Sequence, residues 1–234
     1  MEEVKIETLT MEHHEAVFDF VMTEFVPDEP LSRATEAYTG DGLAEKIFKD
    51  DVRGRYTKKP LESGDSFGVF DDNGKLIGIR LGFISDKRGL HWEPKLGWML
   101  KLPSFLYSKK MLKLLQVSKF LEDIGYSYAN GFDQCEDNNG KIYFCVALGV
   151  SREGRGKGLG SKMLKKSIDY AKEQGCSHMY VLATGKFSQK IMQNHGFYLI
   201  KEKDYASYKD KQGNVIIQHD THTSAQLVAL KLLE

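Results

Sequence analysis

One stretch of the chain, VALGVSREGRGKGLGSKML, restricts the possible folds more than any other, because it joins a strand to a helix through a glycine-rich loop. The apolar run 141–150 is typical of a strand buried on both faces. Residues 158–175 repeat apolar side chains at helical spacing. The loop between them carries glycines at positions 154, 156, 158 and 160. A helix that opens from such a loop directs free backbone N–H groups and its positive dipole end at one point, and glycines let a bulky anion approach. We therefore expect a phosphate or pyrophosphate site here.

The loop also excludes two common phosphate sites. No Lys-Ser or Lys-Thr pair follows a GxxxxG spacing, so it is not a P-loop. Leu159 interrupts the GxGxxG spacing that a dinucleotide fingerprint needs. Arg152, Arg155 and Lys157 add positive charge to the loop. A plain glycine-rich connector with surface charges is the alternative interpretation.

The amino-acid composition limits the cellular compartment and the partners that we expect for this chain. The 33 basic side chains balance 33 acidic ones, which argues against a nucleic-acid partner held by bulk charge. Three cysteines, Cys135, Cys145 and Cys176, form no CxxC pair, and their odd number fits a reducing compartment. The N-terminus MEEVKIETLT is unlike a signal peptide, and no apolar run approaches the roughly 20 residues that span a bilayer. We expect a cytoplasmic protein with no membrane partner and one domain over 1–234; the oligomeric state is not indicated.

The spacing of apolar side chains predicts a helical front with a hairpin, followed by alternating strands and helices. Two apolar runs around Asp72-Asn73-Gly74, within 65–86, are the clearest hairpin, since this turn sequence favours a tight reversal. The other expected segments are strands over 4–10, 141–150, 178–184 and 198–208, helices over 11–26, 41–56, 103–125, 158–175 and 188–197, and a partly extended end over 215–233. This order predicts an α+β domain with a mixed sheet.

Two groups of motifs carry a resemblance to known proteins. The spacing Arg155-x-x-Gly158-x-Gly160, between a buried strand and a long helix, resembles the coenzyme A pyrophosphate loop of the GNAT acetyltransferase superfamily. The segments FVPDEPL and ATGKFSQKIMQNHGFYLIKEKDYASYKDKQGNVIIQ resemble the insect arylalkylamine N-acetyltransferases, which are dopamine N-acetyltransferase-like. The resemblance covers nearly the whole chain, although 101–139 matches only as a generic helix and loop. It implies a GNAT (acyl-CoA N-acyltransferase) fold with a mostly antiparallel sheet flanked by helices, and acetyl-CoA as co-substrate. It places the cofactor contacts at Leu148, Gly149, Val150, Arg155, Gly156, Lys157, Gly158, Leu159, Gly160 and Ser161.

Acetyl transfer to an amine first needs a neutral nitrogen. Alkylammonium groups, with a pKa of about 10, are almost fully charged at neutral pH, and deprotonating them there costs about 4 kcal/mol. Glu29 is suited to take the proton, because Pro30 holds it in an extended conformation directly after an apolar helix, with Asp28 beside it. In the resembled family this glutamate is the proposed general base. From the residues alone, two carboxylates in a solvated turn are the alternative.

The reaction also needs donors for the developing oxyanion and a proton for the leaving thiolate. In the superfamily, the strand before the loop separates from its neighbour and its free N–H groups hold the thioester carbonyl, a role that falls here to Leu148, Gly149 and Val150. Gly149 is suited to a bulge. The insect branch is associated with hydroxyls in a segment that here includes Thr184 and Ser188. Ser188 is either a proton donor or only a helix N-cap.

The sequence leaves the acceptor open. The resemblance implies an arylalkylamine such as dopamine, serotonin, tyramine or similar; the alternatives are a polyamine or agmatine N-acetyltransferase, a non-catalytic acyl-CoA-binding module, and a protein acetyltransferase. The candidate aromatic walls of an amine pocket are Phe25, Tyr38, Trp92, Trp98 and Tyr107. His219 or His222 could line that pocket or be structural, and the histidines form no metal set, so no metal is expected.

Overall fold

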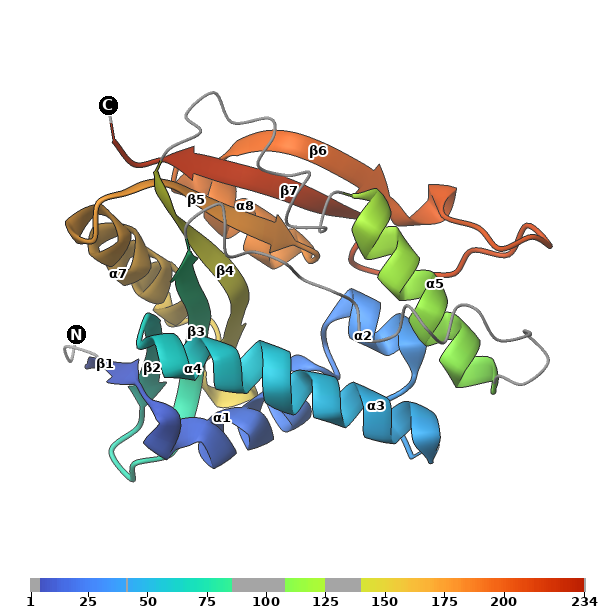
Figure 1. Cartoon of the computed structure of the whole chain (residues 1–234), viewed down its shortest axis with the longest axis horizontal. Coiled ribbons are helices and arrows are strands. Elements are labelled where there is room, and N and C mark those ends of the chain that lie inside the picture. The colour runs from blue at the N-terminus through green and yellow to red at the C-terminus, as the bar shows by residue number, and fades with distance from the viewer. Residues whose placement is uncertain (1–4, 41, 86–107, 125–139, 234) are drawn as a thin grey trace.

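The computed structural model describes residues 5–40, 42–85, 108–124 and 140–233, and its strands form one seven-stranded sheet (Figure 1). The strand order is β1-β2-β3-β4-β5-β7-β6. The strands are β1 (Ile6–Leu9), β2 (Ser66–Phe70), β3 (Leu76–Ser85), β4 (Lys141–Val150), β5 (Cys176–Ala183), β6 (Tyr198–Asp204) and β7 (Ser224–Lys231). Among these described strands, β4 and β5 are the one parallel pair of neighbours. The expected α+β class, with a mixed and mostly antiparallel sheet flanked by helices, is confirmed.

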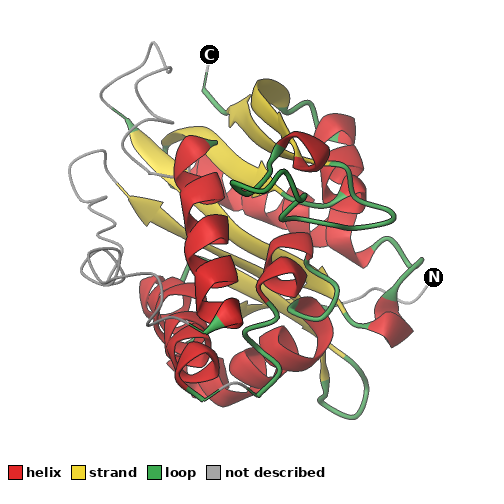
Figure 2. Cartoon of the chain, turned by 90° about the vertical axis from the view of Figure 1, so that its right-hand side faces the viewer, coloured by secondary structure: helices red, strands yellow, loops and turns green. Residues whose placement is uncertain are grey.

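Helices cover both faces of the sheet (Figures 1 and 2). One face carries α7 (Leu159–Glu173) and α8 (Lys186–Asn194), whose Leu164 and Met192 pack with Val181 of β5. The other face carries α1 (His14–Phe20), α2 (Pro30–Thr35), α3 (Leu43–Asp51), α4 (Lys59–Ser63) and α5 (Lys109–Asp123). On that face the side chains of Val17 and Met111 pack with Leu81 of β3. The sheet therefore separates two apolar cores.

In the described part of the chain, two π-helical segments interrupt the helices of the second face. The first, η2 (Val21–Phe25), follows α1 and ends just before the turn that carries Glu29. The second, η3 (Val52–Lys58), joins α3 to α4, so that the helix expected over 41–56 continues to Ser63. Pro60 lacks an N–H and its ring would clash with the carbonyl four residues earlier in a regular α-helix. The wider π turn lets the helix pass this proline, which explains why the sequence prediction stopped too early.

Most other boundaries agree with the sequence. The hairpin reverses at Gly74, which has a φ of 76°, and β4 has the expected bounds. The helix expected over 188–197 begins two residues earlier, at Lys186. The strand expected over 198–208 ends at Asp204, because a 3-10 turn, η7 (Tyr205–Ser207), follows. Residues 103–107 and 125 of the helix expected over 103–125 lie outside the described residues.

The parallel pair separates before its strands end. Pairing between β4 and β5 stops at Cys145 and Val181, although β4 continues to Val150. On its other side β4 stays paired with β3 through Val150, with a register shift where Leu81 faces Ala147 and Gly82 faces Cys145. The extra residue is Val146, so the bulge lies there and not at Gly149, where the sequence suggested it. The backbone edge of 146–150 that faces β5 therefore has no strand partner among the described residues.

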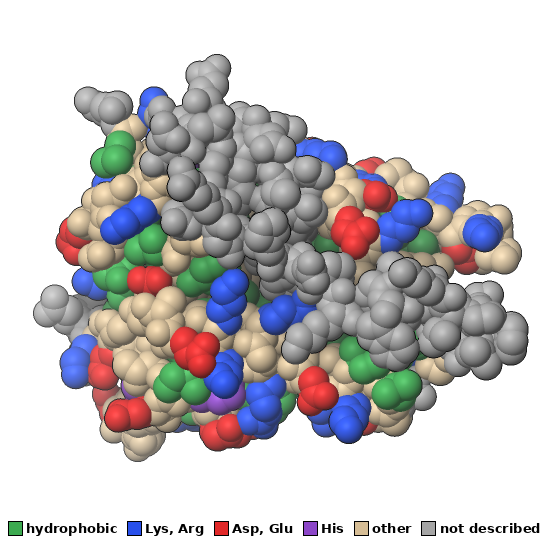
Figure 3. Space-filling view, in the orientation of Figure 1, with side chains coloured by type: hydrophobic (Ala, Val, Ile, Leu, Met, Phe, Trp, Pro, Cys, Tyr) green, Lys and Arg blue, Asp and Glu red, His purple; other side chains and the backbone are tan. Residues whose placement is uncertain are grey.

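Surface charge is mixed in sign on the face shown in Figure 3, where acidic and basic side chains alternate over the helices. Among the described residues, no helix is both long enough and apolar enough to cross a membrane.

Candidate active site

A cavity of about 500 Å³ lies where β4 and β5 separate, and residues from both sides of the sheet line it. From the side of α7 and α8 come Leu148, Ser188 and Met192. From the other side come Phe25 and Glu29, together with a wall formed by α2, α3, η3 and α5. The opening between the two strands thus connects the two layers of the protein through one continuous space.

Glu29 is both a helix cap and a cavity residue. It has extended dihedral angles, φ −81° and ψ 123°, and stands at the N-cap of α2 before Pro30. Its Oε1 accepts a hydrogen bond from the Leu31 N–H at 3.1 Å, and its Oε2 accepts one from the Ser32 N–H at 2.6 Å. Each oxygen keeps a further lone pair. The two sequence interpretations of Glu29 are therefore compatible, because the turn that fixes the carboxylate also places it against the cavity.

Asp28 turns away from Glu29 toward the glycine-rich loop. Its Oδ2 lies 2.5 Å from Arg155 Nη2, and its Oδ1 lies 3.8 Å from Arg152 Nη2. Close by, the Arg152 N–H donates to Glu24 Oε2 at 3.1 Å. The carboxylate of Asp28 is thus balanced by arginines, so a role as an uncompensated like charge beside Glu29 does not fit this geometry.

The glycine-rich loop has the shape that its sequence predicts. Gly156 and Gly158 have φ values of 78° and 73°, which glycine adopts more readily than any other residue, and an added Cβ at either would meet open space. The first intrahelical bond of α7 runs from Lys162 N–H to Gly158 O, so the N–H groups of residues 159–161 are the free donors of the helix start. Two of the predicted cofactor residues have other side-chain contacts: Leu159 is buried, and the Ser161 hydroxyl bonds His195 Nε2 at 2.7 Å. The open concave turn, its free N–H groups and the exposed Lys157 suit a pyrophosphate.

The three β4 residues expected at the acetyl group occupy the unpaired edge of that strand. Leu148 lines the cavity, and Gly149 and Val150 follow it toward the loop. At Gly149, an added Cβ would lie 3.2 Å from a ring carbon of Phe20 and 3.3 Å from one of Phe25. Close aromatic packing, rather than a bulge, therefore explains the glycine.

Thr184 and Ser188 both line the cavity at the start of α8. Gly185 is the N-cap of this helix, so Ser188 lies inside the first turn and the helix-cap interpretation of its hydroxyl is wrong. The Ser188 hydroxyl donates to Gly185 O at 2.8 Å. The Thr184 carbonyl accepts a hydrogen bond of 2.6 Å from Tyr205, whose pKa is raised by burial and by the nearby charge of Glu29. Both hydroxyls of the sequence prediction are therefore brought to the same space as Glu29.

His222 has a structural contact beside these residues. Its Nδ1 accepts from the Lys186 N–H at 3.2 Å, and its ring centroid lies 4.2 Å from that of His219. Burial lowers the pKa of His222. Within the described part of the chain, no group of three histidine, cysteine, aspartate or glutamate side chains could hold a metal ion.

The amine side of the cavity is mainly apolar and aromatic. Phe25, which the sequence suggested, is joined by Phe48 and Tyr56, which it did not. Tyr38 packs against Phe48, with ring centroids 6.4 Å apart, and does not itself line the space. The other suggested aromatics, Trp92, Trp98 and Tyr107, lie outside the described residues.

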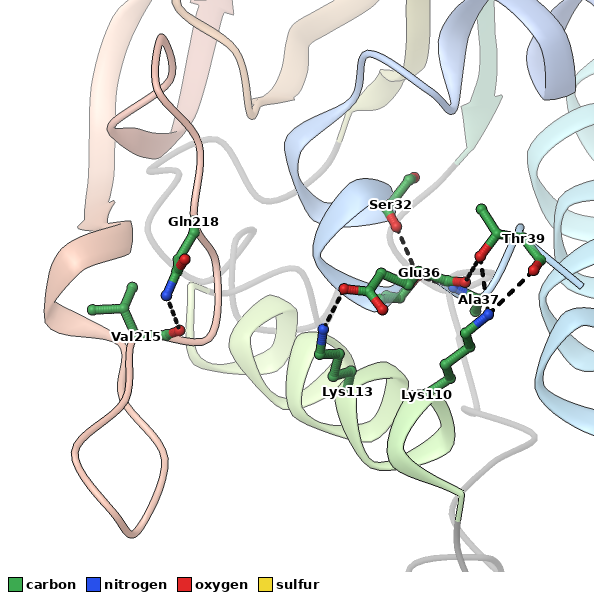
Figure 4. A network of polar contacts seen from close by, with 9 residues as sticks. Ser32, Glu36, Ala37, Thr39, Lys110, Lys113, Val215 and Gln218 are labelled. Carbon is green, nitrogen blue, oxygen red and sulfur yellow. Dashed lines mark hydrogen bonds and ion pairs between the residues drawn. The ribbon is translucent and has the colours of Figure 1, made fainter. Parts of the chain in front are cut away.

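Two lysines hold α5 against α2, so that both helices form one wall (Figure 4). Lys113 Nζ lies 2.6 Å from Glu36 Oε1, and Lys110 Nζ donates to Thr39 O at 3.2 Å. Glu36 ends α2 in the left-handed region, with a φ of 53°, although it is not a glycine. The Lys113 contact lowers the pKa of Glu36. On the cavity side of this wall, α5 contributes Leu114 and Val117.

Sequence reasoning also missed Arg80 of β3, a charged residue inside the apolar run LIGIRLGFIS. Its side chain is fully buried and lines the cavity. A charge in the middle of a buried strand pattern was the available signal, since arginine is rarely buried without a specific contact.

The comparisons with known proteins agree with this arrangement. Residues 122–197 match the acetyltransferase (GNAT) family. The structure resembles arylalkylamine N-acetyltransferase 2 from Aedes aegypti with a TM-score of 0.78 and 24% identity, over 99% of this chain and 100% of that one. The chain has the GNAT fold. A second similar structure is the Drosophila melanogaster polyamine N-acetyltransferase that forms N-acetylagmatine, with a TM-score of 0.67 and 19% identity over 98% of this chain and 100% of that one. A third is the C-terminal condensation domain of Ebony in complex with β-alanyl-dopamine, with a TM-score of 0.70 and 19% identity over 99% of this chain and 100% of that one. At these identities the likeness establishes the fold, and the choice of amine has to be argued from the cavity.

Proposed function

We propose that this protein transfers the acetyl group of acetyl-CoA to the primary amine of a small arylalkylamine such as dopamine, serotonin or tyramine. The observation that carries the proposal is the cavity at the opening between β4 and β5. It brings Glu29, the aromatic wall and the start of α8 together, beside the loop that precedes α7. We further propose that one domain spans 1–234 and, from the cysteine pattern, that it works in the cytosol.

The loop of 155–160 and the first residues of α7 would hold the pyrophosphate of acetyl-CoA. Their backbone N–H groups are the donors, the helix dipole adds a favourable potential, and Arg155 and Lys157 add charge. The unpaired edge of β4 at 148–150 supplies N–H donors to the thioester carbonyl, where negative charge develops during attack. When bound, acetyl-CoA supplies the activated acyl group, and this chain supplies orientation and the proton transfers.

Glu29 is proposed as the base for the incoming ammonium. Its two backbone hydrogen bonds fix the carboxylate in one orientation, so little reorganisation is needed when the amine arrives. Proton removal by a positioned side chain contributes typically about 10²–10⁴-fold in rate. Direct contact or one bridging water both satisfy this role.

Thr184 and Ser188 are proposed as hydroxyls that return a proton to the leaving thiolate. Both line the cavity, and they lie only four positions apart on one side of the strand opening. The Ser188 proton is engaged with Gly185 O, so the hydroxyl has to rotate before it can donate to the sulfur. Because either hydroxyl or a water molecule can supply this proton, we expect no single group to be essential for the step.

The walls of the cavity favour an aromatic monoamine over a polyamine or agmatine. Phe25, Phe48 and Tyr56 offer ring faces to an aryl group. A polycation would meet the guanidinium group of Arg80, which lies in the cavity wall. The carboxylate of Asp51 is already paired with Arg55, and Glu122 has an exposed side chain. This leaves Glu29 as the acid that is best placed for a single amine.

A panel of amines with acetyl-CoA, followed by the release of free thiol, tests the proposal. We expect turnover with tryptamine, tyramine and dopamine at least tenfold higher in kcat/KM than with agmatine or spermidine. The reverse order would select the polyamine alternative. Acetyl-CoA binding by calorimetry without turnover of any amine would favour a non-catalytic acyl-CoA-binding module.

A further inference from the structure

Arg80 is a buried cation that the proposed acetyl transfer does not use. It is opposite Leu148 in the register of β3 and β4, and its residue exposure is 0%. Its Nη1 donates to Leu81 O at 2.7 Å and to Ala147 O at 3.2 Å, which are the facing residues next to the bulge at Val146. One nitrogen of the guanidinium therefore links β3 to β4 beside the bulge.

The Nε and Nη2 of Arg80 have no hydrogen-bond partner among the described residues, although the guanidinium carbon lies 5.7 Å from the ring centroid of Tyr143. The carboxylate of Asp65, on the same side of the sheet, is occupied by the Tyr170 hydroxyl at 2.7 Å and the Ile84 N–H at 2.9 Å. Burial lowers the pKa of Arg80. A buried charge without a counter-ion is costly, because it has lost its hydration and the two carbonyl contacts of Nη1 replace only part of it.

The position of Arg80 indicates what would compensate it. Arg80 lines the same cavity as Cys145, Leu148 and Met192, on the side of α7 and α8. The thioester carbonyl is assigned to the edge of β4 that faces β5, whereas Arg80 lies on β3, across β4. Neighbouring strands are about 4.8 Å apart. Three carbon–carbon bonds of about 1.5 Å span a similar distance, which is the reach of a short acyl chain from its carbonyl to a terminal carboxylate.

We propose that Arg80 is the carboxylate-binding end of the acyl subsite, and that the protein accepts a short dicarboxylic acyl thioester, of the succinyl class, as an acyl donor. Nε and Nη2 present the side-on pair of N–H donors that a carboxylate binds through two parallel hydrogen bonds. The inference rests on the proposed function, because it assumes that acyl-CoA enters this cavity.

The chemistry is unchanged by the new acyl group. The neutral amine nitrogen attacks the thioester carbonyl, the carbon–nitrogen bond forms, and the carbon–sulfur bond breaks. Glu29 takes the first proton from the incoming ammonium before the attack. The second N–H proton, released as the amide forms, passes through a hydroxyl or water to the leaving thiolate. The terminal carboxylate stays bound to Arg80 throughout, so the product is an amide that carries a free carboxylate.

Calorimetry on the wild-type protein provides a test that needs no turnover. Butyryl-CoA and succinyl-CoA have acyl chains of equal length and differ in the terminal group, so their comparison isolates the carboxylate. We expect succinyl-CoA to bind at least tenfold more tightly than butyryl-CoA at low salt. Equal affinity, or weaker binding of succinyl-CoA, would overturn the proposal whatever the mutants show.

Two substitutions separate the carboxylate contact from the link between β3 and β4 beside the bulge. Arg80→Met should remove the preference for succinyl-CoA over butyryl-CoA. The ratio of butyryl-CoA affinity to acetyl-CoA affinity should stay within threefold of its wild-type value. Arg80→Lys should retain part of the preference, since it keeps the charge but loses the paired donors. An Arg80→Met protein that melts normally and still prefers succinyl-CoA would also overturn the assignment. If that variant does not fold, the wild-type comparison and Arg80→Lys decide alone.

This outcome is distinguishable from failure of the proposed function. A protein that binds and uses acetyl-CoA, but shows no preference for succinyl-CoA over butyryl-CoA, contradicts only the acyl subsite. A protein that binds none of the three thioesters contradicts the proposed function and this inference together.

Discussion

The carboxylate of Asp28 and the guanidinium of Arg155 join two segments 127 positions apart in sequence, with Oδ2 and Nη2 separated by 2.5 Å. Arg155 Nε also donates to Val150 O at 3.2 Å, so the same side chain contacts the end of β4. The turn that holds Glu29 is thereby connected to the loop assigned to the pyrophosphate. We therefore expect a substitution in the Glu29 turn to affect the pyrophosphate loop, and a substitution in the loop to affect the turn.

We predict that Arg155→Ala weakens acetyl-CoA binding roughly tenfold, the loss of one charge-assisted hydrogen bond. Asp28→Asn should weaken it roughly threefold, because a partly exposed ion pair contributes about 0.2–1 kcal/mol. The double variant should be no worse than Arg155→Ala alone, since Asp28 acts through the arginine. Calorimetry on the four proteins measures this cycle, and fully additive effects would show that the pair is not coupled.

Glu29 allows its two roles to be separated. Glu29→Ala should lower kcat/KM by roughly 10²–10⁴-fold near neutral pH, because the base is lost. It should also destabilise the protein by about 1 kcal/mol, because the cap of α2 is lost. Glu29→Ser should keep the cap and the melting temperature but show the same loss of activity. For both variants, the deficit should shrink toward about pH 9–10, where the amine deprotonates unaided.

A pH–rate profile with one good amine, together with a thermal melt, checks this prediction. Near-normal activity of Glu29→Ser between pH 6 and 8 would reduce Glu29 to a structural cap.

Ser188→Ala alone should have little effect. The hydroxyl does not cap α8, so the loss of stability should stay below about 1 kcal/mol. The loss in kcat should stay below tenfold, because Thr184 and water remain. Ser188→Ala combined with Thr184→Val should lower kcat by roughly 10²-fold if the hydroxyls are the acids. Single-turnover kinetics with matched melts measures both, and a double variant as active as the wild type would assign the proton to water.

The Gly158 turn can be tested with a matched pair of substitutions. Gly158→Asn should be tolerated, because asparagine is among the residues that most readily adopt a positive φ. Gly158→Glu should cost about 1–2 kcal/mol in backbone strain and also place a negative charge at the pyrophosphate site. Acetyl-CoA affinity should therefore fall strongly only for Gly158→Glu. Similar affinities for the two variants would place the phosphate site elsewhere.

The contact between Glu36 and Lys113 predicts a pH dependence. The pKa of Glu36 is lowered by Lys113, so the stabilisation is present above the ordinary glutamate pKa and is lost as pH falls through the lowered value. Lys113→Gln should therefore destabilise the protein slightly at pH 7 and should flatten the decrease of stability below pH 5. Denaturant melts across pH 3–7 test this, with Lys119→Gln as a control on the same helix. An unchanged acid limb in Lys113→Gln would contradict it.

The fold was readable from the sequence where patterns are local. The hairpin at Gly74, the buried strand β4 and the start of α7 each follow from turn chemistry or apolar spacing within one segment. The continuation of α3 through Pro60 was missed, because proline normally ends a helix and the π turn leaves no distinct pattern.

The sequence predicted the separate motifs of the candidate site but not how they come together in space. The glycine loop, Glu29, Thr184 and Ser188 were identified by motif, but their convergence depends on long-range contacts. The separation of β4 from β5 is a property of strand pairing, so the apolar run of β4 alone does not predict where that pairing stops. Arg80 was visible as a charge within an apolar run, but its meaning required the bulge and the cavity beside it.

The place of β7 in the sheet has a consequence for synthesis of the chain. This strand is the last in sequence but pairs with β5 on one side and β6 on the other. Until residues 224–231 leave the ribosome, β5 and β6 both present open backbone edges, and β6 has exposed Tyr198 and Leu199. Chains grow at about 5–20 residues per second, so this exposed state is brief but unavoidable for every copy made. Premature termination before residue 224 would leave both edges open permanently, and such fragments should aggregate or be degraded rather than persist as partly active protein.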